Sequence, residues 1–249
     1  MKRKRNKLKN KITCIVAGLA LFAASCMEPG LTVAAANAGI HSVKEKYAIE
    51  SDVILNGNGS GCHAKLVFLT SVSAFSFGIQ YDEHAIKPYN GKAVLMVENV
   101  QNNSPGGQTY DWPKGVVVEK GKPCHLMLTL TKNGDLRTYY NGEVIGTYHN
   151  DGLSEKMVAP GFAVRVEGAG RKNGDTIDAR FENLSVKRGK TVNGSVTEYP
   201  GLYDLNKTIK SSYDPKARSA HIMGSISGLG KKDWDSAPAS VSGCVQFQF

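Results

Sequence analysis

Polar side chains recur at alternate positions in three segments of this sequence. In 75–82, 95–98 and 162–167 the apolar residues share one side of an extended chain, which leaves the polar residues together on the other side. If these segments lie in one sheet, its outer face carries Gln80, Asp82, Glu98, Arg165 and Glu167. Amide, carboxylate and guanidinium groups can hydrogen-bond the hydroxyl groups of a sugar. The alternative is an ordinary solvated face, on which Arg165 pairs with Glu98 or Glu167.

Two loops supply further candidate contact residues. The loop after the glycine-rich segment 102–107 carries Tyr110 and Trp112, and an exposed aromatic ring can stack on the flat face of a pyranose. Alternatively, Trp112 fills the core from this loop. The glycine-rich stretch 168–175 lacks the spacing of a phosphate-binding loop, so we expect it to join two strands. Arg171 could touch a ligand from there.

Support for a metal site is weak. Cysteine precedes histidine at 62–63 and at 124–125, but the C-x₂₋₄-C and H-x₃₋₅-H spacings of zinc sites are absent. Asp233 and Asp235 flank Trp234 and could offer oxygen ligands to calcium. Because two carboxylates alone are a weak signal, the sequence predicts no cofactor, with calcium as the alternative.

Short strands must position these residues, because turn signals separate alternating segments throughout 47–186. The clearest case is 125–148, where Leu126, Leu128 and Leu130 share one side. Two Asn-Gly pairs, at 133–134 and 141–142, predict type I′ hairpin turns there. No long amphipathic helix is visible, and 153–158 could hold one short helical turn. The sequence predicts an all-β fold, an antiparallel two-sheet β-sandwich.

The N-terminal region is typical of a secretory signal peptide. Seven Lys or Arg residues in 1–11 precede an apolar run at 12–24, and Ala36-Asn-Ala38 provides a cleavage site. We therefore expect residues 1–38 to be removed and the protein to be secreted. A lipoprotein is the alternative, because Ala23-Ala-Ser-Cys26 loosely resembles a lipobox, with Cys26 as the lipid-anchored residue.

Removal of the signal changes the balance of charge. The whole chain has a net charge of +9, but residues 39–249 retain only +3. Nucleic-acid sites need clustered Lys and Arg, so we expect no nucleic-acid partner. Nor does the sequence predict a transmembrane segment after residue 38.

The remaining 211 residues suit one sandwich domain. We expect the sandwich to span 39–188 and residues 189–249 to form a partly ordered extension. The last strand of that extension, at about 241–249, could complete the sandwich beside the first strand. Removal of the signal leaves three cysteines, Cys62, Cys124 and Cys244. Three cysteines can form at most one internal disulfide.

Three segments resemble the concanavalin A-like lectin/glucanase superfamily, including its laminin-G-like modules. They are 47–68, the hairpin Leu136-Arg-Thr-Tyr-Tyr-Asn-Gly142, and the closing strand Phe181-Glu-Asn-Leu-Ser-Val186. The resemblance covers about 47–186 and implies a jelly-roll sandwich, whose relatives often bind sugars on a concave sheet face. Laminarinase-like members carry Glu-x-Asp-x-x-Glu on one strand. Here Glu50 and Asp52 are followed by Leu55, which removes the support for catalysis of that type.

The sequence favours a secreted, non-catalytic protein that binds carbohydrate or another surface ligand. Its long basic head resembles the signal peptides of Gram-positive bacteria. One alternative is a glycoside hydrolase or lyase with dispersed carboxylates such as Asp82, Glu98 and Glu167. The other is a structural or adhesive surface protein without a small ligand.

Overall fold

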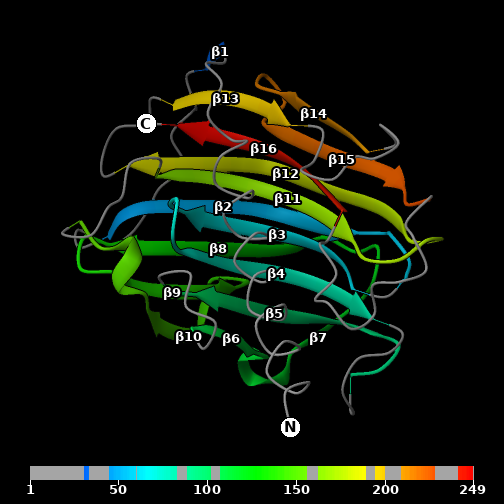
Figure 1. Cartoon of the computed structure of the whole chain (residues 1–249), viewed down its shortest axis with the longest axis horizontal. Helices are drawn as coiled ribbons and strands as arrows, with labels where there is room; N and C mark the ends of the chain where they lie inside the picture. The colour runs from blue at the N-terminus through cyan, green and yellow to red at the C-terminus, as the bar shows by residue number, and fades with distance from the viewer. Residues whose placement is uncertain are drawn as a thin grey trace, which may run out of the picture.

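The computed structural model describes residues 31–33, 45–59, 61–82, 89–101, 107–155, 162–188, 194–199, 209–227 and 241–248. They form two antiparallel sheets that pack as a β-sandwich (Figure 1). The predicted fold class is therefore confirmed. The described helical residues form only two 3₁₀ turns, η1 (Pro113–Gly115) and η2 (Asp151–Leu153). None of the described helices is long and apolar enough to cross a membrane.

Sheet A contains nine strands. In spatial order they are β1 (Leu31–Val33), β13 (Gly194–Tyr199), β16 (Val241–Gln248), β11 (Ala163–Gly170), β3 (Cys62–Leu69), β4 (Ala74–Asp82), β5 (Lys92–Val100) and β6 (Gln108–Asp111), and β7 (Val117–Val118) also pairs with β5.

Sheet B contains seven strands. In spatial order they are β10 (Glu143–His149), β9 (Asp135–Tyr140), β8 (Cys124–Thr131), β2 (Glu45–Leu55), β12 (Thr176–Arg188), β15 (Ser219–Ser225) and β14 (Lys210–Asp214).

The core lies between the two sheets. Phe75, Phe77 and Ile79 of β4 enter it from sheet A, and Leu126 and Leu128 enter it from sheet B, all of them buried. Alternation along each strand sends these side chains inward and their neighbours outward. Truncation of either phenylalanine to alanine is expected to cost about 3–5 kcal/mol of stability.

The two Asn-Gly turns of the β8–β9–β10 meander differ from each other. Asn141 and Gly142 both have positive φ, 49° and 85°, which confirms the predicted type I′ geometry. At the other turn only Gly134 has positive φ (91°), and its N–H bonds to Thr131 O across a longer loop. The type I′ prediction was wrong there, because the loop 132–134 is one residue longer than 141–142, which lets Asn133 keep an ordinary conformation.

Residues beyond 188 contribute strands to both sheets. β14 and β15 form a hairpin that extends sheet B through β12, and β16 lies between β13 and β11 in sheet A. The last strand thus pairs with β11 rather than with β2. Cys62, Cys124 and Cys244 are all buried free thiols.

Several predictions fall outside the described residues. These are the signal-peptide features apart from 31–33, the Cys26 lipobox, and the acidic pair around Trp234.

Candidate functional site

The outer face of sheet A, which points away from sheet B, brings the predicted polar positions together. Strand register aligns Tyr110, Glu98, Ser76, Val67, Arg165 and Gln246 in one row across the sheet. The next row runs from Gly78 through Lys65 to Glu167, and the third joins Gln80 to His63. The two candidate regions of the sequence, the strand faces and the aromatic loop, therefore form one surface.

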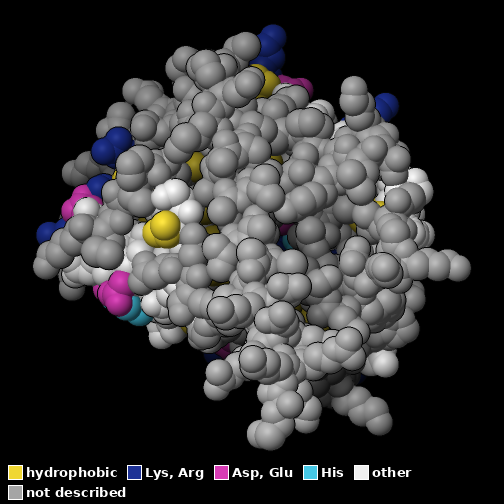
Figure 2. Space-filling view, in the orientation of Figure 1, with side chains coloured by type: hydrophobic (Ala, Val, Ile, Leu, Met, Phe, Trp, Pro, Cys, Tyr) yellow, Lys and Arg dark blue, Asp and Glu magenta, His cyan; other side chains and the backbone are white. Residues whose placement is uncertain are grey.

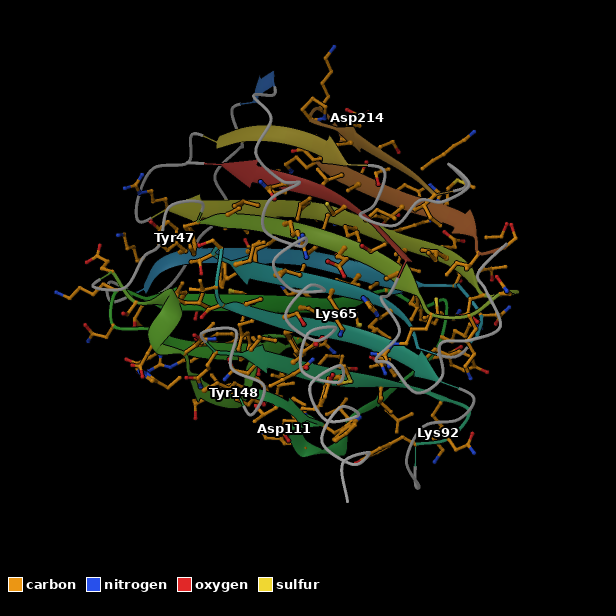
Figure 3. The ribbon with its side chains drawn as sticks, viewed as in Figure 1. Tyr47, Lys65, Lys92, Asp111, Tyr148 and Asp214 are labelled. Carbon is orange, nitrogen blue, oxygen red and sulfur yellow. The ribbon has the colours of Figure 1, made fainter. Side chains whose placement is uncertain are left out.

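Lys65 lies near the middle of this face (Figure 3) and pairs with Glu98 two strands away. Their Nζ–Oε2 distance is 3.3 Å, although the backbones of β3 and β5 lie about 10 Å apart. The lysine side chain can cross β4 because Gly78 stands opposite Lys65 and has no side chain. A Cβ on Gly78 would overlap the Ala64 carbonyl oxygen and lie 2.6 Å from Lys65 Cα. Any larger residue at this position would therefore have to displace the backbone of β3.

Glu167 holds a second, fully buried charge cluster. Arg165 NH2 lies 2.6 Å from its Oε2, and His63 Nε2 lies 3.2 Å from its Oε1. Burial alone would raise the pKa of Glu167, but Arg165 and the hydrogen bond from His63 outweigh burial and lower the pKa to about 2. The alternative in which Arg165 pairs with Glu167 therefore holds for the partner. The pair is buried, however, and does not lie on a solvated face.

His63 faces acceptors on both sides of its ring. Nδ1 lies 3.1 Å from the Gly61 carbonyl oxygen, and Nε2 faces Glu167. Burial and the charge of Lys65 lower the pKa of His63, against the opposing effect of Glu167. A neutral ring has one N–H and can donate to only one of these acceptors.

The side of the face formed by β5 and β6 reaches solvent. Glu98 and Tyr110 are cross-strand neighbours, and Gln108 Nε2 donates to both Glu98 Oε1 (2.5 Å) and Tyr110 Oη (2.6 Å). Tyr110 is 46% exposed. Trp112 stacks on Tyr89 with ring centroids 6.2 Å apart and is not among the side chains that pack on the core.

Two polar atoms on β4 have no hydrogen-bond partner within the described chain. Ser76 Oγ and Gln80 Oε1 are buried, with residue exposures of 7% and 9%, and they flank Gly78 on the outer face. Most buried polar atoms in proteins are hydrogen-bonded, so two orphans on neighbouring outward positions need an explanation. A ligand that supplies the missing partners is one.

The remaining predicted residues occupy the end of the face where β3 begins. Arg171 follows β11. Its charge contributes to the lowered pKa of His63 and opposes the burial and the Glu98 charge that raise the pKa of Tyr110, so its guanidinium acts across the face. The backbone of Asp82 pairs with Lys92 at the end of β4, but the side chain of Asp82 lies outside the described part of the molecule.

Three residues of this face were missed by the sequence interpretation: His63, Lys65 and Gln108. The first two alternate with Ala64, Leu66 and Phe68 in β3, so the same alternation that found Gln80 could have found them. The alternation is obscured because every residue of β3 is buried. Gln108 gave no signal, since its role depends on the pairing of β6 with β5.

Neither carboxylate of the face suits a general acid at neutral pH. Burial raises the pKa of Glu98, but Lys65, His63 and the hydrogen bond from Gln108 together lower it below its ordinary value. The pKa of Glu167 is also lowered, to about 2. Glycosidases need one carboxyl group that stays protonated, and both of these are ionised. No group of His, Cys, Asp and Glu within the described residues has the geometry of a metal site.

Comparison with known proteins adds little to this picture. No protein-family model and no curated protein matches the chain. Among solved structures, SCP-B, an eqolisin-family peptidase in complex with the tripeptide Ala-Ile-His, is similar with a TM-score of 0.42 and 10% identity over 80% of this chain and 97% of that one.

Two agarase-related structures are also similar. The catalytic domain of β-agarase D from Zobellia galactanivorans has a TM-score of 0.28 and 11% identity, over 83% of this chain and 65% of that one. The catalytic domain of PdAgaC has a TM-score of 0.25 and 9% identity, over 89% and 76%. Similarities this weak carry no argument about function, and the assignment of a β-sandwich rests on the strand pairing itself.

Proposed function

We propose that this protein binds carbohydrate on the β4-to-β6 side of the sheet A outer face and does not cleave it. The observation that carries the proposal is the pair of unpartnered buried atoms, Ser76 Oγ and Gln80 Oε1, next to Glu98 and the exposed ring of Tyr110. Sugar hydroxyls both donate and accept hydrogen bonds, so they can satisfy a hydroxyl, an amide oxygen and a carboxylate together. The Tyr110 ring offers a surface for stacking.

The ionised state of both carboxylates supports binding over hydrolysis. Glu98 is held by Lys65 and Gln108, and Glu167 by Arg165 and His63. These partners keep the carboxylates as acceptors, whereas hydrolysis needs one of them as a proton donor. The basic head and apolar run of the sequence lead us to propose further that the protein is secreted.

Calorimetric titration with a panel of neutral and acidic oligosaccharides tests the proposal. We expect saturable binding, weakened about threefold to tenfold in Tyr110→Ala through loss of stacking and about fivefold in Gln80→Ala through loss of one hydrogen bond. Tyr139→Ala is the matched control, because Tyr139 pairs with Met127 on the outer face of sheet B.

Two outcomes would contradict the proposal. If no saccharide binds at millimolar concentration, the face has another role, such as adhesion to a protein. If the panel releases reducing ends or unsaturated products and Glu98→Gln abolishes that release, the site is catalytic.

A further inference from the structure

The described charges on the sheet A outer face differ in how they are paired. Among the described side chains, the cations are Lys65, Arg165 and Arg171 and the carboxylates are Glu98 and Glu167. Each carboxylate already has a cation in ion-pair distance, Lys65 at 3.3 Å and Arg165 at 2.6 Å. Because the pKa of His63 is lowered, this ring adds no further positive charge at neutral pH. Arg171 is therefore the cation of this face without an ion-pair partner among the described residues.

The guanidinium of Arg171 is directed over the face. Its stem passes close to Gly61, where a Cβ would lie 2.7 Å from Arg171 Cδ. Its charge contributes to the lowered pKa of His63 on β3. It also opposes the burial and the Glu98 charge that raise the pKa of Tyr110 on β6, although three strand spacings separate those strands. The guanidinium therefore lies electrostatically near both the buried and the solvent-facing parts of the site.

Nothing within the described chain neutralises this guanidinium. Arg171 Nε is buried without a hydrogen-bond partner. The nearby Asp175 uses its Oδ2 to accept the backbone N–H groups of Arg171 and Lys172, at 2.8 and 3.0 Å, and forms no ion pair with the guanidinium. A buried donor of a charged group without an acceptor is costly, so an acceptor from outside the chain would be strongly favoured here.

We infer that the saccharide bound by this face is acidic, and that its oxyanion is held by Arg171. This inference rests on the proposed function and deepens it. Guanidinium groups bind planar or tetrahedral oxyanions through paired N–H donors, as carboxylates and sulfates require. Ser76 and Gln80 are left to serve the hydroxyl groups of the same ligand. The ligand class is therefore a uronate-containing or sulfated polysaccharide.

Paired polymers that differ only in charge test the inference. Polygalacturonate and its carboxyl-reduced form are one arm, and dextran sulfate and dextran are the other, each titrated by calorimetry into the full chain at 150 mM salt. We expect at least one charged polymer to bind tenfold or more tightly than its neutral partner. The arm that shows this difference distinguishes carboxylate from sulfate.

Variants separate a specific contact from general attraction. Arg171→Ala should lower affinity for the preferred acidic polymer roughly tenfold to hundredfold and leave the neutral polymer unchanged. Arg180→Gln removes the same charge from an exposed position on sheet B and should change neither. Thermal unfolding of each variant confirms that it is folded.

Three results have different meanings. Equal binding of neutral and acidic polymers overturns the inference and leaves the proposed function standing. Equal losses in Arg171→Ala and Arg180→Gln also overturn it, since the attraction is then non-specific. If no polymer binds in either arm, the inference fails, and the oligosaccharide panel decides separately whether the proposed function stands.

Discussion

The outer faces of the two sheets carry similar residue types in different surroundings. On sheet B the ion pairs reach solvent: His125–Asp52 at 2.9 Å, His221–Asp178 at 2.8 Å and Arg180–Asp178 at 3.3 Å join side chains that are 28–48% exposed. The Lys187–Glu50 pair is the more buried exception there. On sheet A, Lys65 and Arg165 are only 1% and 2% exposed.

The difference lies in burial, which sets the energetic cost of each charge. Exposed pairs stabilise a fold by about 1 kcal/mol or less and keep a surface hydrated. Buried charges cost several kcal/mol each unless they are paired, so a protein that needed only a soluble sandwich gains nothing from them. Among the described residues, buried polar atoms without a hydrogen-bond partner include those of Ser76, Gln80 and Arg171 on or beside the sheet A outer face and that of Ser185 on sheet B.

The largest expected effect comes from breaking the Glu167 cluster. Glu167→Gln leaves Arg165 buried without its counter-charge and should lower the free energy of unfolding by about 3–5 kcal/mol. The sheet B control, Asp178→Asn, removes an exposed carboxylate and should cost about 1 kcal/mol or less. Urea denaturation measures both values. Equal costs would mean that burial does not distinguish the two faces.

Acid should destabilise the protein through the same residue. The pKa of Glu167 is about 2 in the folded protein and near 4.5 in the unfolded chain. Its contribution is therefore complete above about pH 4.5 and is lost as the pH falls toward 2, on the order of 3 kcal/mol in all. Stability measured from pH 6 to pH 2.5 should fall less steeply in Glu167→Gln. A slope identical to that of the wild type would contradict the low pKa.

Glycine positions offer a third comparison. Gly78→Ala on sheet A forces a Cβ against the backbone of β3 and should cost about 1–3 kcal/mol. Gly146→Ala on sheet B meets the ring and hydroxyl of Tyr148, whose half-buried side chain can move aside, so its cost should be clearly smaller. Thermal unfolding measures the cost of each substitution. A larger cost for Gly146→Ala than for Gly78→Ala would contradict this prediction.

The smallest effect belongs to His149, at the end of β10. The space-filling view shows acidic side chains next to a histidine at one edge of the molecule (Figure 2). Its ring nitrogens lie 2.8 Å from Asp151 and 2.9 Å from Asp135, and these hydrogen bonds raise the pKa of His149 above its ordinary value of 6.5.

Because the pKa is raised on folding, this contribution is complete below about pH 6.5 and is lost as the pH rises through the folded value. Since the site is exposed, the change should be below about 1 kcal/mol. His149→Gln should flatten stability between pH 6 and pH 8.5, opposite in direction to the acid effect on sheet A. If His149→Gln has the same pH dependence of stability as the wild type, the two sheets do not differ in this respect.

Much of the strand layout follows from local patterns. Alternation within 75–82 and 125–130 assigned side chains to the core or to the outer faces, because successive residues of a strand point in opposite directions. The conformational freedom of Asn141-Gly142 predicted a hairpin turn for the same local reason. The sequence by itself therefore determined the all-β class, and which side chains of each strand share a face.

Contacts between distant segments were decided only in three dimensions. The pairing of Glu98 with Tyr110, the reach of Lys65 over Gly78, and the place of β16 beside β11 depend on strand order, which local patterns do not encode. Burial likewise separated the charges of sheet A from those of sheet B, although the two sets look alike in the sequence. Alternation along a strand determines on which face a side chain lies, whereas the packing of the sheets determines which residues it contacts.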